Sequence, residues 1–292
     1  MLGYSVDKWL FFFFFYCIVG WVWECIYCSV IEKKLINRGF MRGPVIPIYG
    51  CGACTMIIAS IPFTGNYVLT FLSGMILASL LEFVTGALME ALFAVRYWDY
   101  SNHKFNLKGY ICLYASVGWG IATLITTSFI QKPVNALADS IPENILELIV
   151  RLFALIFVVD FTLSFRAALD IRAMLTKMDS MKSEVQRMIK RVDVMIAFAG
   201  EEKAQPSKYD DLVKALESKL ALAKEKLELS EETREEIALF KAKLVMMKDR
   251  IGQVMPIRDV ISKLAIRDNP GMVSEKFKDS LDDLKNLINR KE

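Results

Sequence analysis

Three glutamates of this chain stand within long apolar runs, where carboxylates are rare. Glu24 follows a phenylalanine-rich segment, and Glu82 and Glu90 share a second apolar stretch. A charge at the centre of a bilayer costs roughly 2.5–3.5 kcal/mol on insertion scales, so such carboxylates are candidates for binding a cation or relaying protons. Glu82, Gly86 and Glu90 are spaced by four, which places them on one face of a helix.

Polar residues between the apolar runs complete the candidate set. The chemistry of Arg38 suits binding an anionic group or holding a carboxylate ionised. Glycines and prolines from Gly39 to Gly50 predict irregular backbone, which survives at membrane depth only when it is buried in protein or lines a cavity. We therefore expect a polar pocket open to the cytoplasm and formed by Glu24, Asn37, Arg38, Glu82, Glu90 and Asp99. The alternative is a set of buried ion pairs and hydrogen bonds that fix helix packing.

The elements that must position these residues are membrane-spanning helices. A span needs roughly 20 mainly apolar residues. Five segments qualify: Trp9–Ile31, Pro44–Ile61, Tyr67–Val95, Tyr110–Ile130 and Ile145–Phe165. The sequence therefore predicts an all-α, polytopic bundle of about five transmembrane helices embedded in a lipid bilayer.

The orientation follows from the Lys and Arg residues between the spans. The first and third connections and the segment after the fifth span are rich in Lys and Arg, whereas the second connection has none and the fourth has only Lys132. Cytoplasmic loops carry the excess of Lys and Arg. We therefore expect a plasma-membrane protein with its N-terminus outside and its C-terminal tail in the cytoplasm.

The distribution of charge divides the chain into two parts. Residues 1–165 carry 10 Lys and Arg and 10 Asp and Glu, whereas residues 166–292 carry 26 and 23. This division predicts a transmembrane domain over 1–165 and a cytoplasmic helical, coiled-coil tail over 166–292. The net charge of +3 is too small to indicate nucleic acid binding.

Apolar residues of the tail recur at spacings of three and four, as in coiled coils. The first helix is expected to continue directly from the last span, because neither Gly nor Pro occurs between Phe165 and Ala199. The tail is interpreted either as helices packing on one another within one chain or as a dimerising coiled coil. Two apolar stripes carry this interpretation: Ile171, Met174, Met178, Met181, Val185, Met188, Val192 and Met195, and Ile237, Phe240, Leu244, Met247, Ile251 and Val254.

Motifs of common enzymes and cofactor sites are missing from the sequence. It has no GxxxxGK[ST] phosphate-binding loop, no GxSxG, no HExxH and no dinucleotide-binding fingerprint. The pairs Cys25-x-x-Cys28 and Cys51-x-x-Cys54 lack a His or acid at zinc spacing and are interpreted as small apolar residues. We expect no metal, no cofactor and no assigned catalytic residue, and whether the chain is an enzyme stays open.

Several separated motifs resemble the ABC-transporter type IV family, a group of bacterial membrane proteins. The resemblance covers roughly residues 10–125 and implies a permease that works with a separate ATPase. The motifs are Gly20-Trp21 with Glu24, Asn37-Arg38-Gly39-Phe40, Gly43-Pro44, Pro47-Ile48-Tyr49-Gly50, Glu82, Gly86, Glu90, Trp98-Asp99-Tyr100-Ser101, Asn106, Gly109 and Trp119-Gly120.

These observations favour a permease-like transport component whose polar pocket takes a small solute or an ion. Two other functions stay open. Carboxylates with an arginine also suit a membrane-embedded enzyme acting on a lipid or lipid-linked substrate, and the tail would suit a membrane-anchored scaffold. Five spans are few for a complete transporter, which predicts a homodimer or a separate ATPase subunit as partner.

Overall fold

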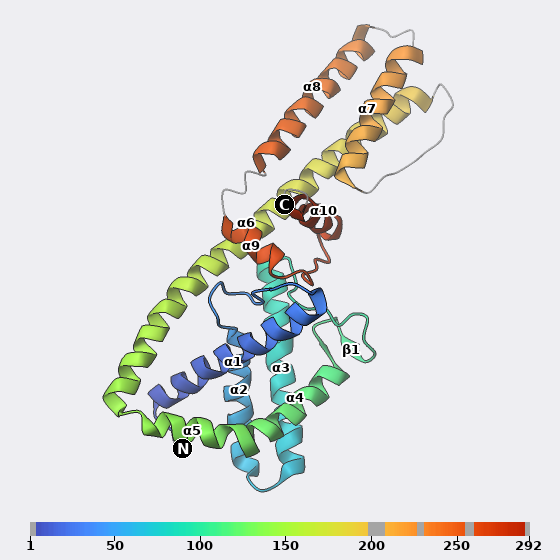
Figure 1. Cartoon of the computed structure of the whole chain (residues 1–292). Helices are drawn as coiled ribbons and strands as arrows, with labels where there is room; N and C mark the ends of the chain where they lie inside the picture. The colour runs from blue at the N-terminus through green and yellow to red at the C-terminus, as the bar shows by residue number, and fades with distance from the viewer. Residues whose placement is uncertain (1–3, 198–207, 227–230, 255–259, 290–292) are drawn as a thin grey trace. The chain divides into compact units, whose positions relative to one another are not determined.

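The computed structural model describes residues 4–197, 208–226, 231–254 and 260–289 (Figure 1). It is almost entirely helical, as the sequence predicts. The chain forms two compact units. Unit 1 comprises Met1–Leu169 and Leu264–Val273, and unit 2 comprises Asp170–Lys263 and Ser274–Glu292. The C-terminal part of the chain thus contributes a short segment to the apolar unit.

Within the described ranges, four helices are long and apolar enough to cross a membrane. These are α1 (Val6–Glu32), α3 (Tyr67–Phe93), the continuous helix over Leu113–Ser140, and the apolar first part of α6 (Glu143–Ala197). Each corresponds to an expected span. Within unit 1, α1 packs against α2 (Pro47–Ser60), α2 against α3, and α3 against α4 (Leu113–Ile125).

The expected second span, Pro44–Ile61, is the exception. Only α2 and the short 3₁₀ turn η1 (Ile61–Phe63) are helical there, which makes an apolar helix shorter than the other four. The preceding segment explains why. The Ile46 amide donates to the carbonyl of Cys17, 3.1 Å away and near the middle of α1, so irregular backbone reaches that level before α2 begins. A count of five full spans therefore remains a prediction.

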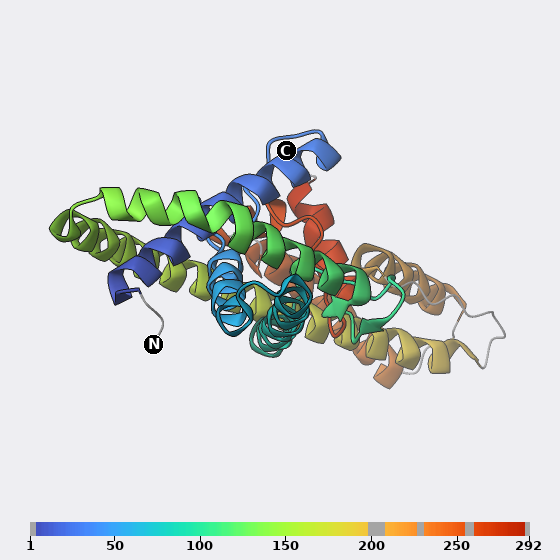
Figure 2. The ribbon, with the colours of Figure 1, turned by 90° about the horizontal axis from the view of Figure 1, so that it is seen from below.

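The helix after Leu113 continues further than the sequence predicts. Instead of ending near Ile130, it passes through a π-helical turn, η2 (Thr126–Ile130), into α5 (Gln131–Ser140), and Figure 2 shows the joined helix in green. Pro133 has no amide hydrogen and would interrupt a regular α-helix. The π turn, in which the Gln131 amide donates to the Thr126 carbonyl, immediately precedes this position.

The small amount of β-structure in unit 1 lies in the segments that connect its helices. Strands β1 (Asn106–Leu107) and β2 (Ile111–Cys112) pair antiparallel, with Asn106 opposite Cys112. The segment Leu264–Val273 begins in α9 (Val260–Arg267) and ends at Val273, which forms an antiparallel bridge with Arg96. Met272 of this segment is fully buried.

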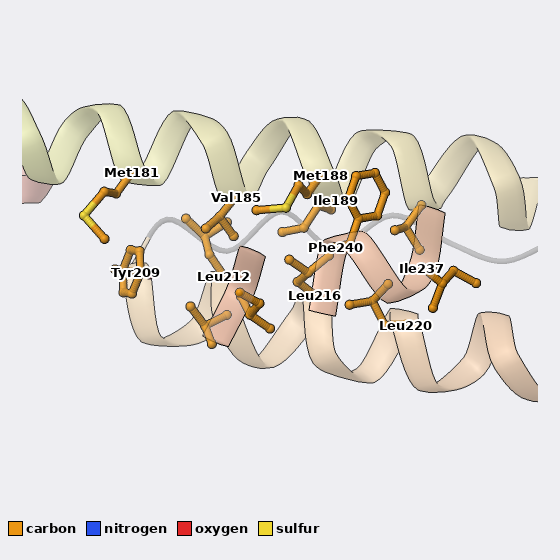
Figure 3. Packing of buried hydrophobic residues seen from close by; sticks show 13 residues of the cluster. Met181, Val185, Met188, Ile189, Tyr209, Leu212, Leu216, Leu220, Ile237 and Phe240 are labelled. Carbon is orange, nitrogen blue, oxygen red and sulfur yellow. The ribbon is translucent and has the colours of Figure 1, made fainter. Parts of the chain in front are cut away.

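Unit 2 has a core formed by three helices. The second part of α6 packs with α7 (Tyr209–Lys226) and α8 (Glu231–Val254) (Figure 3). Residues of both apolar stripes contribute, so these parts of the stripes pack together within one chain. The side chains of Met195, Met247, Ile251 and Val254 lie outside the described set. The core contains Met181, Val185, Met188, Ile189, Val192, Tyr209, Leu212, Val213, Leu216, Leu220, Ile237, Phe240 and Leu244.

The last helix, α10 (Lys278–Asn289), adds a buried ion pair to unit 2. Asp283 lies 2.6 Å from the Lys182 ammonium of α6 and accepts a hydrogen bond of 3.3 Å from the Tyr209 amide. The side chains of Lys182 and Asp283 are only 7% and 11% exposed.

Helix α6 is a single helix from Glu143 to Ala197, which confirms the expected continuation from the last span into the tail.

Candidate functional site

Glu82 is the most buried of the candidate carboxylates. It lies on α3, is 5% exposed, and accepts hydrogen bonds from the Trp119 indole at 2.9 Å and from the Tyr100 hydroxyl at 3.1 Å. Both donors are neutral groups. Glu82 forms no ion pair within the part of the chain that the structure describes. Its carboxylate is thus hydrogen-bonded without a balancing positive charge from those residues.

Tyr100 donates a hydrogen bond to one candidate carboxylate, Glu82, and is influenced more weakly by the charge of a second, Glu24. Its amide donates to the Gly109 carbonyl at 2.9 Å, which fixes the loop after α3, while its hydroxyl reaches back to Glu82. Burial raises the pKa of the Tyr100 phenol, and the negative charges of Glu82 and, more weakly, Glu24 raise this pKa further. Glu24 and Glu82 therefore act on the same phenol, although they come from different helices.

Glu24 is held by a second tyrosine. The Tyr49 hydroxyl donates to its carboxylate at 2.7 Å, and the Arg38 guanidinium lies 4.0 Å from it. Arg38 in turn donates to the Tyr97 carbonyl at 2.7 Å. The ring centroids of Tyr49 and Trp119 are 6.4 Å apart. The rings of Tyr49 and Trp119 thus lie between the Glu24 group and the Glu82 group.

Asn37 serves the loop after α1. Its side-chain oxygen accepts a hydrogen bond of 2.6 Å from the Trp21 indole, and its amide nitrogen donates to the Arg42 carbonyl at 2.8 Å. Both contacts fix the path of the loop between α1 and α2. They position the neighbouring Arg38 and add no group to the Glu82 cluster.

Asp160 also holds this loop, a contact that the sequence analysis did not identify. Its carboxylate accepts a hydrogen bond of 2.8 Å from the Gly43 amide, and a Cβ at Gly43 would lie 3.0 Å from the same carboxylate. An amide that is left unpaired at this depth would cost about 1–3 kcal/mol. The position of Asp160 within an apolar run marks it as a candidate in the sequence. Its partner Gly43 is 117 residues away, and no sequence pattern links the two.

Glu90 and Asp99 belong to a different cluster, built around Arg96. The Arg96 guanidinium lies 2.6 Å from Glu90 and 3.9 Å from Asp99. The Tyr110 hydroxyl donates to Glu90 at 2.5 Å, and this hydrogen bond raises the pKa of Tyr110. Asp99 also accepts from the Ser101 amide at 2.9 Å and from its hydroxyl. This arrangement fixes the connection between α3 and α4.

The segment Leu264–Val273 forms hydrogen bonds with the loop between α1 and α2 and with the loop between α3 and α4. Arg96 and Val273 exchange backbone hydrogen bonds of 2.7 and 3.0 Å, and the Asn269 side chain donates to the Gly39 carbonyl at 3.0 Å. Nothing in the sequence pattern indicated this contact. It secures the backbone at Gly39, which follows Arg38, and at Arg96 itself.

The expected pocket thus separates into two parts. Three aromatic side chains bring Glu24, Arg38 and Glu82 together. These are Tyr49, Tyr100 and Trp119, and each belongs to a motif identified in the sequence. Glu90 and Asp99 surround Arg96 instead. Within the described ranges, no group of three or more His, Cys, Asp or Glu side chains is arranged to hold a metal ion.

Four long apolar helices and a carboxylate buried on one of them define an integral membrane protein. A family model described as "Putative ABC-transporter type IV" matches residues 11–165, just over half of the chain. The chain belongs to this family, which confirms the resemblance seen in the sequence. Neither a curated protein nor a solved structure matched the chain.

Proposed function

We propose that this chain is the membrane-spanning subunit of a transporter and that Glu82, with Glu24, binds a small cationic solute or ion. Family membership supports a membrane transport component. The proposed site combines two carboxylates with the rings of Tyr49, Tyr100 and Trp119. Carboxylates attract a cation by charge, and aromatic faces add cation–π attraction.

The observation that carries the proposal is the environment of Glu82. Its carboxylate is buried on a membrane-spanning helix, yet its hydrogen-bond donors are an indole and a phenol. Charges within membranes are costly and are normally paired. A bound cation or a proton supplies the missing positive charge, so Glu82 is suited to exchange one for the other.

The remaining candidate residues have supporting roles in this proposal. The Arg38 guanidinium lies 4.0 Å from the Glu24 carboxylate and is itself fixed by the Tyr97 carbonyl. Glu90 and Asp99 neutralise Arg96, and Asn37 fixes the loop that carries Arg38. These contacts give the site rigid walls. They do not place a further free carboxylate beside Glu82.

The proposal assigns the site to the cytoplasmic side of the plasma membrane. Glu24, Arg38 and Tyr100 lie at the end of α1 and in the loops that carry most of the Lys and Arg residues of unit 1. An excess of Lys and Arg favours the cytoplasm. The N-terminus would then be outside and unit 2 inside.

Energy would come from a partner, because the sequence contains no phosphate-binding loop of its own. The test is mass spectrometry of the tagged protein after gentle solubilisation from its native membrane. We expect a stoichiometric ATPase subunit that carries a GxxxxGK[ST] motif. A homo-oligomer without any ATPase would contradict this assignment and would favour the lipid enzyme or the scaffold.

A further inference from the structure

Polar side chains follow one stripe along the helix from Leu113 to Ser140. A turn of α-helix takes 3.6 residues, so residues spaced by four drift around a regular helix. The wider π turn at Thr126–Ile130 reduces this drift. The stripe therefore continues across the span. Its members, at intervals of four, are Trp119, Thr123, Thr127, Gln131, Asn135 and Asp139.

The end of the stripe near the start of α1 is a chain of polar contacts. Asp139 forms an ion pair with Lys8, and the Asn135 amide donates to Asp139 at 3.0 Å. One helical turn before Asn135, the Tyr16 hydroxyl donates to the Gln131 side-chain oxygen at 2.8 Å. Lys8 and Tyr16 both belong to α1, so α1 and α5 share this polar surface.

Two buried side-chain atoms of this polar stripe have no hydrogen-bond partner among the described residues. Gln131 Nε2, a donor, and Asn135 Oδ1, an acceptor, are buried on successive turns, and neither has a hydrogen-bond partner among the described residues. Gln131 is 7% exposed, so its side chain is more than nine-tenths buried. A buried polar group left unpaired costs about 1–3 kcal/mol. Buried polar groups of this kind are normally satisfied by ordered water.

Oxygen atoms continue the stripe toward Glu82. The hydroxyls of Thr127 and Thr123 donate to the carbonyls one turn earlier, at 2.7 and 2.8 Å. A hydroxyl that donates one hydrogen bond still has lone pairs to accept another. The next turn carries Trp119, which donates to Glu82. A polar atom is thus present at every turn from Asp139 to Glu82.

We propose that this stripe holds a chain of ordered waters that carries protons between the Lys8–Asp139 end of the span and Glu82. A water that accepts from Gln131 Nε2 and donates to Asn135 Oδ1 satisfies both atoms. Each step passes one proton from one water oxygen to the next, so no other reactant is needed. The inference rests on the proposed function in one respect, namely that Glu82 exchanges a proton or cation.

Hydroxyl-radical footprinting of the full-length protein in nanodiscs tests whether the stripe is hydrated. Tyr16 and Phe14 are both 6% exposed and lie on α1, so they form a matched pair. After correction for intrinsic reactivity, we expect several-fold faster modification of Tyr16 and loss of that excess in Gln131→Leu. Equal modification of Tyr16 and Phe14 in the wild type would overturn the proposal, even if the variant does not fold.

Proton flux into liposomes that contain the protein tests the second part. After an external acid pulse, we expect Gln131→Leu to slow internal acidification several-fold relative to Leu137→Ala, a change at an apolar residue of α5 that is 47% exposed. Equal flux in both variants would overturn the proton path. Failure of Glu82 to bind a cation, with Tyr16 still labelled, would instead reject the proposed function alone.

Discussion

The backbones of Arg96 and Val273 pair antiparallel, with N–O distances of 2.7 and 3.0 Å. Val273 follows helix α9, and Arg96 follows the membrane helix α3. The same Arg96 side chain neutralises Glu90. The C-terminal segment therefore holds the loop that carries one of the two polar clusters, and it is structurally part of the membrane unit.

Replacement of Met272 tests the contribution of this segment. Met272 is 0% exposed, so Met272→Ala is expected to lower the free energy of unfolding by about 2–5 kcal/mol. Met246 is 62% exposed, and Met246→Ala is expected to change the free energy of unfolding by no more than about 0.5 kcal/mol. Thermal unfolding of the purified variants compares the two. Equal midpoints would show that the segment adds no stability.

Glycine substitutions in α2 test its packing against α1. A Cβ at Gly50 would overlap the Cys17 thiol and would lie 2.5 Å from the Phe13 carbonyl oxygen. Gly50→Ala is therefore expected to cost about 1–3 kcal/mol. At Gly52 the nearest atom, on Trp119, would be 3.6 Å away, so Gly52→Ala should be tolerated. Membrane abundance and melting temperature measure both. A tolerated Gly50→Ala would contradict the α1–α2 contact.

The ion pair between Lys182 and Asp283 is the test for unit 2. Asp283→Asn leaves the buried ammonium of Lys182 without its counter-charge, which is expected to cost about 3–5 kcal/mol. The pair between Lys243 and Glu184 has side chains 49% and 46% exposed. Glu184→Gln should therefore cost less than about 1 kcal/mol. Denaturant unfolding of the full chain compares the variants, and similar losses for both would refute the burial of α10.

Much of this fold follows from the sequence because hydrophobic runs and periodicity are local signals. The span predicted over Tyr67–Val95 gives α3 to within two residues, and the stripe from Met181 to Val192 identifies a buried helix face. The helix through Pro133 was not predicted, because the π turn that accommodates it has no sequence signature. The shortness of α2 depends on the Ile46–Cys17 contact, which no pattern indicates.

The candidate site was predictable only in part. Intramembrane carboxylates pointed to Glu24 and Glu82, whose tyrosine and tryptophan donors come from motifs that the sequence analysis identified. The division between Glu82 and Glu90 was not predictable from their spacing of four. It depends on Arg96, which follows α3 and pairs with Glu90 at 2.6 Å and with Asp99 at 3.9 Å.

This division gives opposite expectations for two conservative substitutions. Glu90→Gln removes the nearer of the two carboxylates that pair with the Arg96 side chain, which is 10% exposed, and is expected to destabilise the protein on the order of 2–3 kcal/mol. Glu82→Gln keeps one oxygen that can accept from the Trp119 indole, its amide nitrogen can donate to the Tyr100 hydroxyl, and no described cation loses its partner. It should leave membrane abundance near the wild-type level. A larger loss of folded protein for Glu82→Gln would favour a purely structural role.

The most direct test of the cation site is thermal unfolding of the purified full-length protein with Na⁺, K⁺ or choline at matched ionic strength. Ligand at 100 times its dissociation constant stabilises a folded protein by about 2.7 kcal/mol. We predict that at least one cation raises the melting temperature of the wild type and of Glu90→Gln, and that Glu82→Gln loses this increase while remaining folded. An undiminished increase in Glu82→Gln, or no response of the wild type to any of the three, would contradict a cation site at Glu82.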